Sequence, residues 1–255
     1  MNINKRQSEI LQIIKEHSSM NVKDILPLFD VSAATIRKDL AILERASLIL
    51  RTRGEVHLPA KTDLTPFESR SYINRDAKIR IAKKAVEMID DGDVIILDSG
   101  TTTLEIAELL KNNRSITVLT NSIPIAHTLS NSQVAVTVVG GMLFGRNIST
   151  QGPDAEHYFS QVEVNKVFLG ASGTRSDVGL TSLTPLEASI KRCMMRSAQK
   201  VFAVFDSTKF NCCGINLFAD FSELDYIITD APITDQALNH RLDKLKLECI
   251  VAGSD

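Results

Sequence analysis

The sequence predicts an α/β protein in two parts: a small N-terminal domain of helices with a β-hairpin, and a larger C-terminal domain with a parallel sheet. Two observations lead to this prediction. Three short amphipathic segments and a β-like segment occupy the first 57 residues, and from residue 73 short β-branched runs alternate with helical segments. Such alternation indicates strands joined by crossover helices. We therefore expect domains at residues 1–57 and 73–255, with a linker over residues 58–72.

The composition is that of an ordinary globular protein and excludes several classes. Of the 255 residues, 44% are hydrophobic and 24% are charged, as in typical soluble domains. No apolar run approaches the roughly 20 residues that span a bilayer, and the N-terminus lacks the apolar core of a signal peptide. We expect a cytoplasmic protein with no membrane partner. The four cysteines have neither zinc-site spacing nor disulfide-scaffold density, so we expect reduced thiols and no metal.

The N-terminal segments are predicted to form a winged helix-turn-helix. A turn at Asp30–Ser32 separates the second and third helices, with Ser32 as N-cap of the third. Residues 48–56 read as two short strands around Gly54, which form the wing. The apolar positions that close the core are Ile10, Leu11 and Ile14, then Val22, Ile25, Leu26 and Phe29, then Ile36, Leu40 and Leu43.

The third helix carries a face suited to DNA. Small or hydrogen-bonding residues near its start suit base edges in the major groove, basic residues one turn later suit phosphates or guanine, and wing arginines suit the flanking backbone. With a net charge of −2, the contact has to come from such a local patch. The predicted DNA-binding residues are Ser32, Ala34, Thr35, Arg37, Lys38, Arg51 and Arg53. A merely solvated face and a protein-interaction module are the alternatives.

A second motif lies in VIILDSGTTTLEIAELL, where a buried strand feeds into the start of a helix. Gly100 permits a tight turn, and the threonine hydroxyls and free helix N–H groups then surround the positive end of the helix dipole. This arrangement predicts a phosphate site. The run has neither the GK[ST] ending of a Walker A loop nor GxGxxG, so we expect a small phosphorylated metabolite and no nucleotide cofactor.

Polar or glycine-rich segments follow the other predicted strands as well. In a parallel sheet, ligands bind beyond the carboxyl ends of the strands, so these segments should converge with the phosphate turn. An ordinary turn or helix cap is the alternative for each one. The predicted ligand-binding residues are Asp98, Ser99, Gly100, Thr101, Thr102, Thr103, Thr120, Asn121, Ser122, Gly141, Gly170, Ser172, Glu187 and Lys209.

The run VSAATIRKDLAILERASLILRTRGEV (residues 31–56) resembles the signature of the DeoR family of bacterial sugar-metabolism regulators. It departs from the family pattern at Ser47, where glycine is usual, and at Arg53 and Glu55, where a His-Gly-Gly wing is usual. The resemblance continues through the C-terminal domain in DSGTTT, TNS, VVGG, FLGASG and DSTKF. It implies a repressor that binds operator DNA and is released by a phosphorylated sugar.

The DeoR effector domain is similar in turn to pentose-phosphate isomerases, which implies a Rossmann-like sheet. Those enzymes need an acidic loop, a glutamate base and a lysine; here the matching loop, Gly170–Gly173, has no acid, and only Glu187 and Lys209 remain. We therefore expect no catalytic residues. Glu187 has a second interpretation, because it could cap the helix that begins near Pro185 and pair with Lys191 four residues later.

Taken together, the residues and the resemblance predict a regulator of a sugar or polyol catabolic operon. Its expected partners are operator DNA, a phosphorylated sugar and further copies of itself, since operator dyads mirror protein symmetry. Dimer and tetramer are both open, and repression over activation follows only from the resemblance. The alternative function is a sugar-phosphate isomerase or hydrolase with a DNA-binding appendage.

Overall fold

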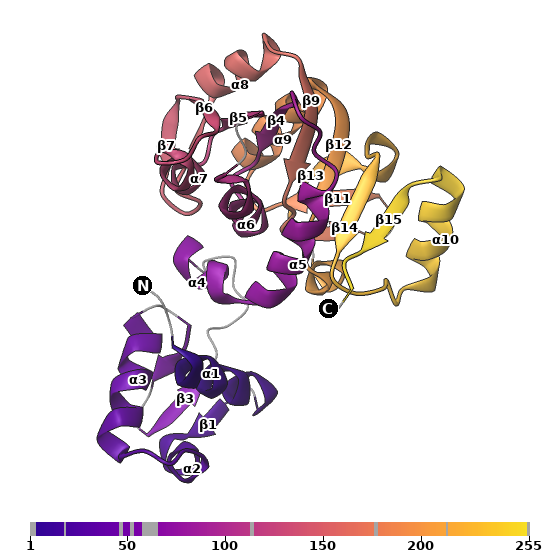
Figure 1. Ribbon diagram of the computed structural model, residues 1–255. Helices are drawn as coiled ribbons and strands as arrows, with labels where there is room; N and C mark the ends of the chain where they lie inside the picture. Colours follow the sequence, from indigo (N-terminus) through magenta and orange to yellow (C-terminus); the bar gives the residue numbers. More distant parts are fainter. Residues whose placement is uncertain are drawn as a thin grey trace. The chain divides into compact units, whose positions relative to one another are not determined.

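A computed structural model describes residues 4–17, 19–45, 48–51, 54–57, 66–112, 115–175, 178–212 and 214–253 (Figure 1). The chain divides into two compact units, Met1–Ile73 and Asn74–Asp255. Within the described residues, no helix is both long and apolar enough to cross a membrane.

The N-terminal unit has the predicted helices and wing. Its elements are α1 (Lys5–His17), β1 (Ser19–Asn21), α2 (Val22–Ile25), the 3-10 helix η1 (Leu26–Leu28), α3 (Ala33–Arg45), β2 (Leu50–Arg51), β3 (Glu55–His57) and α4 (Phe67–Tyr72). The second predicted helix is only one α-helical turn. It passes into η1 at Pro27, which has no N–H to continue the helical ladder.

The strands of this unit form an antiparallel sheet in the order β1-β3-β2. Strands β2 and β3 flank Gly54, whose φ of 86° is left-handed, as the predicted wing requires. Strand β1 was not predicted, because Ser19-Met20-Asn21 has no apolar alternation. The predicted core is confirmed: Ile10, Ile14, Ile25, Ile36, Leu40 and Leu43 are fully buried together.

The predicted linker is partly helical. Residues 58–65 lie outside the described residues, but α4 occupies most of the remainder. Tyr72 and Ile73 at its end pack against the core of the N-terminal unit. Asn74 then begins the second unit with a left-handed backbone, at φ 52° and ψ 36°.

The C-terminal unit has the predicted parallel sheet (Figure 1). Its seven strands lie in the order β15-β14-β12-β9-β4-β5-β6, and each neighbouring pair is parallel. The strands are β4 (Val94–Leu97), β5 (Thr117–Thr120), β6 (Ala135–Val138), β9 (Val164–Leu169), β12 (Ala198–Val204), β14 (Tyr226–Thr229) and β15 (Glu248–Val251).

Helices cover both faces of this sheet, and the strand side chains divide between them. One core contains Ile95, Leu97 and Phe168 with residues of α5 (Arg75–Val86), α6 (Thr101–Leu110) and α7 (Ile123–Leu129). The other contains Ile96, Val167 and Leu169 with residues of α8 (Pro153–Ser160), α9 (Pro185–Arg196) and α10 (Gln236–Leu245). This alternation is the two-residue period of a strand buried on both faces.

Several short strands outside the main sheet were not predicted. β7 (Met142–Phe144) and β8 (Ser149–Gln151) form a hairpin, while β10 (Gly173–Arg175), β11 (Gly179–Ser182) and β13 (Asn216–Asp220) form a second antiparallel sheet. Two 3-10 turns, η2 (Ser207–Asn211) and η3 (Phe221–Glu223), complete the unit. These strands are only three to five residues long. β8 and β10 contain no large apolar residue, and β7 consists of three consecutive apolar residues, so neither kind shows the apolar alternation by which strands are recognised.

An ion triad ties the amino ends of β4 and β9 together: Lys166 and Asp93 are buried, whereas Asp90 is exposed. The Lys166 ammonium donates to Asp90 and Asp93, each at 2.5 Å. This hydrogen bond and the positive charge of Lys166 lower the pKa of Asp90. Burial of the Lys166 ammonium works against its charge, but the hydrogen bonds to both aspartates outweigh it and raise the pKa of Lys166.

We predict that Lys166→Met lowers the free energy of unfolding by about 1–3 kcal/mol at neutral pH, since it leaves the buried Asp93 carboxylate without its charged donor. A raised lysine pKa stabilises the fold below the ordinary value of 10.5, and that contribution is lost as pH rises through the folded value. A lowered aspartate pKa stabilises the fold above 3.8, and that contribution is lost as pH falls.

Urea unfolding of the wild-type protein and of Lys166→Met, repeated across pH, should therefore show the largest difference in unfolding free energy between pH 3.8 and pH 10.5. The matched control is Lys84→Met, which removes an exposed pair with Glu87 and should change stability by less than about 1 kcal/mol. A Lys166 effect that does not vary with pH would contradict the assignment.

Candidate functional site

The order of the strands marks one place, at the carboxyl ends of the strands, where a ligand crevice is expected. From β4 the chain adds β5 and then β6 on one side, whereas β9, β12, β14 and β15 lie on the other side. Connections therefore leave β4 and β9 in opposite directions, which opens a crevice beyond their carboxyl ends. Asp98 follows β4 and Gly170 follows β9 at this switch point.

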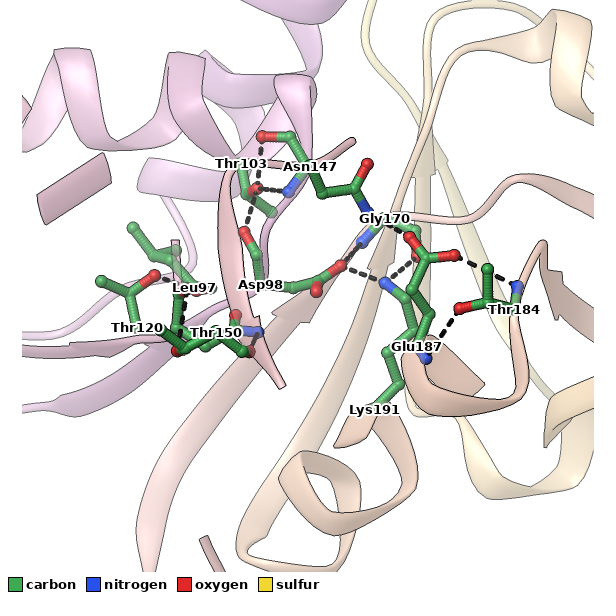
Figure 2. A network of polar contacts seen from close by, with 12 residues as sticks. Leu97, Asp98, Thr103, Thr120, Asn147, Thr150, Gly170, Thr184, Glu187 and Lys191 are labelled. Carbon is green, nitrogen blue, oxygen red and sulfur yellow. Dashed lines mark hydrogen bonds and ion pairs between the residues drawn. The ribbon is translucent and has the colours of Figure 1, made fainter. Parts of the chain in front are cut away.

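Asp98 joins three elements there (Figure 2). Its Oδ2 accepts from the Gly170 N–H at 3.1 Å and from the Lys191 ammonium, and Lys191 also donates to the Gly170 carbonyl at 2.9 Å. Lys191 comes from α9 and lies 5.2 Å from the centre of the Phe218 ring. Both charged side chains are almost fully buried, so each depends on the other for its compensation.

Two of the predicted ligand-binding residues have a buried acceptor with no donor within the described residues. The two atoms are Oδ1 of Asp98 and Oδ1 of Asn121. Buried polar atoms are nearly always hydrogen-bonded in folded proteins, so an unpartnered one needs a reason, and a ligand donor is one such reason. Among the described residues, no other predicted ligand-binding residue has a fully buried side-chain acceptor without a donor.

The predicted phosphate turn has the expected form. Helix α6 begins at Thr101 directly after Gly100, and the hydroxyls of Ser99, Thr101 and Thr102 have no partner among the described residues. The Thr103 hydroxyl is committed to the turn itself, because it accepts from the Gly100 N–H at 3.0 Å and donates to the Asp98 carbonyl at 2.6 Å. The first-turn N–H groups are thus aligned on a rigid turn.

Gly100 suits this place because of its close neighbours. A Cβ on Gly100 would lie 3.1 Å from the Thr103 hydroxyl and 3.8 Å from Cα of Gly170. A side chain would therefore press on the hydrogen bond that shapes the turn. Gly141 is fixed by a different constraint, because its φ is 139° and a Cβ there would lie 2.8 Å from the Gln151 carbonyl.

Residues 120–122 brace the turn after β5 through hydrogen bonds within the protein. The Thr120 hydroxyl donates to the Leu97 carbonyl at 2.7 Å and accepts from the Ser122 N–H at 3.0 Å. Ser122 caps α7, and the Asn121 amide donates to the Thr150 carbonyl at 2.7 Å. Thr120 and Ser122 thus have structural partners, and their role toward a ligand stays a prediction.

Glu187 caps a helix, which was the second interpretation of this residue. With Thr184 it forms a capping box at the start of α9, and its other oxygen accepts from the Asn147 amide of the loop between β7 and β8 (Figure 2). The predicted pair between Glu187 and Lys191 is wrong, because the Lys191 ammonium is drawn to Asp98 and Gly170 instead.

The other predicted residues lie beyond the ends of β9 and β12. Ser172 is half-buried and its N–H donates to the Thr181 carbonyl at 2.9 Å. Lys209 lies half-buried in η2, and its ammonium has no partner among the described residues. Asp206 caps η2 through the Thr208 N–H and also accepts from the Asn74 amide at 3.0 Å.

The N-terminal unit presents the predicted basic face. Ala34, Arg37 and Lys38 on α3 are exposed, and neither cation has a partner among the described residues. Ser32 caps α3 as predicted: its hydroxyl accepts from the Thr35 N–H at 3.2 Å and bonds the Thr35 hydroxyl at 2.8 Å. Arg51 lies 3.6 Å from Glu44 in an exposed ion pair. Arg53 lies outside the described residues.

A buried carboxylate that was not predicted fixes the angle of α3. Asp39 accepts from Arg6 at 2.6 Å and from Gln7 at 2.7 Å, both on α1. These three residues and Lys38 border a surface hollow of about 430 Å³ between the two helices. The pairing joins residues more than 30 positions apart, so no local spacing in the sequence could indicate it.

Comparison with known proteins accounts for both units. Residues 6–62 match the DeoR-like helix-turn-helix domain, and residues 73–231 match the DeoR C terminal sensor domain. The chain belongs to the DeoR family. Among DeoR-type relatives, it is 33% identical over 254 residues to the putative aga operon transcriptional repressor of Escherichia coli O157:H7, which covers 97% of this chain and 93% of that protein.

A second DeoR-type relative is the glycerol-3-phosphate regulon repressor of Escherichia coli strain K12, 31% identical over 228 residues, or 89% of this chain and 90% of that protein. Among solved structures, ribose 5-phosphate isomerase A from Methanocaldococcus jannaschii is similar at a TM-score of 0.39 and 17% identity, over 53% of this chain and 54% of that one. The strand order of the chain itself gives its DeoR sensor domain a parallel sheet, with the candidate site at the β4/β9 switch point.

We predict that Lys191→Met lowers the free energy of unfolding by about 3–5 kcal/mol, because it leaves the Asp98 carboxylate buried without a counter-charge. Adding Asp98→Asn should recover part of that loss, since the double variant buries no charge. Urea unfolding of the two single variants and the double variant measures the coupling.

Lys111→Met, which removes an exposed pair with Glu108, is the matched control and should change stability by less than about 1 kcal/mol. Strictly additive effects of the Asp98 and Lys191 substitutions would show that the two side chains do not depend on each other.

Proposed function

We propose that this chain represses a sugar or polyol catabolic operon and is released from its operator by a phosphorylated sugar or polyol. The observation that carries this proposal is that one chain contains both features. Its α3 has an exposed cationic face, and its sensor domain has an unpartnered buried carboxylate oxygen at the carboxyl ends of the strands. The glycerol-3-phosphate regulon repressor, a relative over most of the chain, controls genes named for a small phosphorylated polyol. Such a regulator acts in the cytoplasm, where operator DNA lies.

The DNA contact is assigned to the start and exposed face of α3. Ala34 and Thr35 lie at the helix start, where a methyl or hydroxyl meets base edges, and Arg37 and Lys38 follow, where cations meet phosphate or guanine. The Asp39 contacts with Arg6 and Gln7 hold α3 against α1, so that this face is presented at a fixed angle. Ser32, Arg51 and Arg53 are assigned to the flanking backbone.

The effector contact is assigned to the edge at Asp98. The phosphate is placed on the first turn of α6, where Ser99, Thr101 and Thr102 offer free hydroxyls beside aligned N–H groups. Oδ1 of Asp98 and Oδ1 of Asn121 would accept hydrogen bonds from sugar hydroxyls. Lys209 would add positive charge, and Gly141, Gly170 and Ser172 would form the walls.

The effector signal is assigned to the first residues of α5. Asn74 donates to Asp206 in the loop that carries Lys209, and Arg75 binds Glu105 of α6 at 2.9 Å. Tyr72 and Ile73, directly before them, pack on the core of the DNA-binding unit. A ligand that shifts the Asp206–Lys209 loop or α6 therefore acts on the residues that directly follow the DNA-binding unit. The affinities for operator and effector then change each other reciprocally.

We predict that Arg37→Ala with Lys38→Ala weakens operator binding and lowers its salt dependence. Each lost phosphate contact should reduce the slope of log affinity against log salt concentration by about 1. Fluorescence anisotropy with promoter DNA over a salt series gives the slope. Lys23→Ala with Lys84→Ala removes the same net charge away from α3 and should leave the slope unchanged; an unchanged slope in the α3 variant would exclude this face.

Screening phosphorylated sugars and polyols against the protein–operator complex tests the proposal as a whole. One compound should release the DNA, and Thr102→Val should weaken that compound's binding without weakening operator binding. A protein that binds promoter DNA specifically but responds to no such compound would contradict the effector assignment, and one with no specific DNA binding would contradict the repressor assignment.

Asn74→Gly should uncouple the two sites. Glycine keeps the left-handed backbone but removes the amide that binds Asp206, so both affinities should persist while the effector-induced change in operator affinity, typically about 5–150-fold in such systems, shrinks towards one. The control is Lys246→Gly, at another left-handed, exposed position. If the affinities for operator and effector both fall while the effector-induced change in operator affinity stays the same, coupling through Asn74 is contradicted.

A further inference from the structure

One long stretch of the sensor domain carries no formal charge. Residues 115–145 contain no lysine, arginine, aspartate or glutamate and only one histidine, His127, although 24% of the whole chain is charged. This run, which we call the neutral segment, includes β5, α7, β6 and β7. A surface segment of this length is ordinarily interrupted by charges that keep it in water, so the exposed part of the neutral segment needs an explanation.

The neutral segment forms one edge of the main sheet. β6 is the terminal strand and, among the described residues, pairs only with β5. The Val139 N–H bonds the Thr120 carbonyl, so by the alternation of a parallel ladder the peptide groups of Val136 and Val138 face away from β5. These groups are a template for pairing with another strand.

The edge lacks the devices that ordinarily prevent such pairing. Natural edge strands are protected by charged side chains, proline or bulges, and β6 has none of these. The opposite edge strand, β15, differs: Glu248 lies within it and Lys246 comes just before it. The two edge strands of this sheet therefore differ: β15 carries a charged residue, and β6 carries none.

Exposed apolar side chains gather beside this edge. Val138 is 48% exposed, and Met142 and Leu143 of β7 are 62% and 67% exposed. The start of α7 lies next to the same hairpin, because the Ile123 N–H donates to the Ile148 carbonyl, and Ile123 is also exposed. Figure 1 shows β6, β7 and α7 together at this end of the sheet.

We propose that this edge, made of β6, β7 and the start of α7, is the interface through which the sensor domain binds a second copy of this chain. The occupant follows from charge. A two-fold interface places a surface against its own image, so a surface with net charge repels itself, whereas a neutral apolar one does not. The β6 strands would pair antiparallel through Val136 and Val138, and Met142 and Leu143 would supply the apolar contact.

The test is the mass of the full-length protein in solution, measured by sedimentation velocity. Leu143→Lys and Val138→Lys each place two like charges across the two-fold axis, and each should lower the number of associated copies or weaken association by about tenfold or more. Because Leu143 is 67% exposed, a charge there changes folding stability little, and thermal unfolding of each variant verifies this.

Val251→Lys on β15 is the matched control. Val251 is 41% exposed on the other edge strand, so this variant adds the same charge at a similar site and should leave the mass unchanged. The proposal is overturned if the wild-type protein is monomeric, if both neutral-edge variants keep the wild-type mass, or if Val251→Lys dissociates the protein while they do not. Association with a different protein in place of a second copy would also overturn it.

Discussion

The sensor domain depends most on the contact of Asp98 with Lys191 and Gly170. This one carboxylate holds the end of β4, the end of β9 and the middle of α9 in a fixed relation. The phosphate turn begins directly after Asp98, and Glu187 on the same α9 anchors the hairpin loop through Asn147. Lys191 donates to one oxygen of the Asp98 carboxylate, and the other oxygen has no donor among the described residues. The same side chain therefore stabilises the carboxyl ends of β4 and β9 and offers one unused acceptor there.

The DNA-binding unit uses the same principle on a smaller scale. Its helices are too short to be stable alone, and the apolar core of Ile10, Ile36 and Leu40 brings α1 and α3 together. Apolar packing leaves the rotation of a helix loosely defined, whereas the Asp39 carboxylate, which accepts from two residues of α1, defines it. In the DNA-binding unit a buried aspartate orients the helix that is assigned to DNA, and in the sensor unit a buried aspartate directly precedes the turn that is assigned to the phosphate.

The sequence was sufficient where signals are local. Short β-branched runs indicated the main-sheet strands and apolar spacing of 3.6 residues indicated the helix faces, because each such signal lies within the element itself. Strands such as Ser149–Gln151 and Gly173–Arg175 could not be recognised, since they are short and polar and are held by neighbours that are distant in the sequence.

The partner of Lys191 was assigned wrongly for a related reason. Glu187 is four residues away along the helix, but its carboxylate accepts from the Thr184 N–H and the Asn147 amide, whereas Asp98, 93 residues away, accepts from Lys191. Local spacing offers candidate partners, and the hydrogen bonds of the folded protein decide between them. The prediction of the sheet edge as the ligand-facing side rested instead on topology, which several independent strand–helix units specified together.

The passage between the two units is only a few residues long, which bears on how such regulators recombine. Within residues 72–74 the chain goes from side chains packed on one core to an amide bonded inside the other unit. A chimaera that joins another DNA-binding module to this sensor therefore has little sequence to spare at the junction. It has to keep Asn74 and Arg75 with the sensor and take the two apolar residues before them from the incoming module, so that each half retains its own contacts.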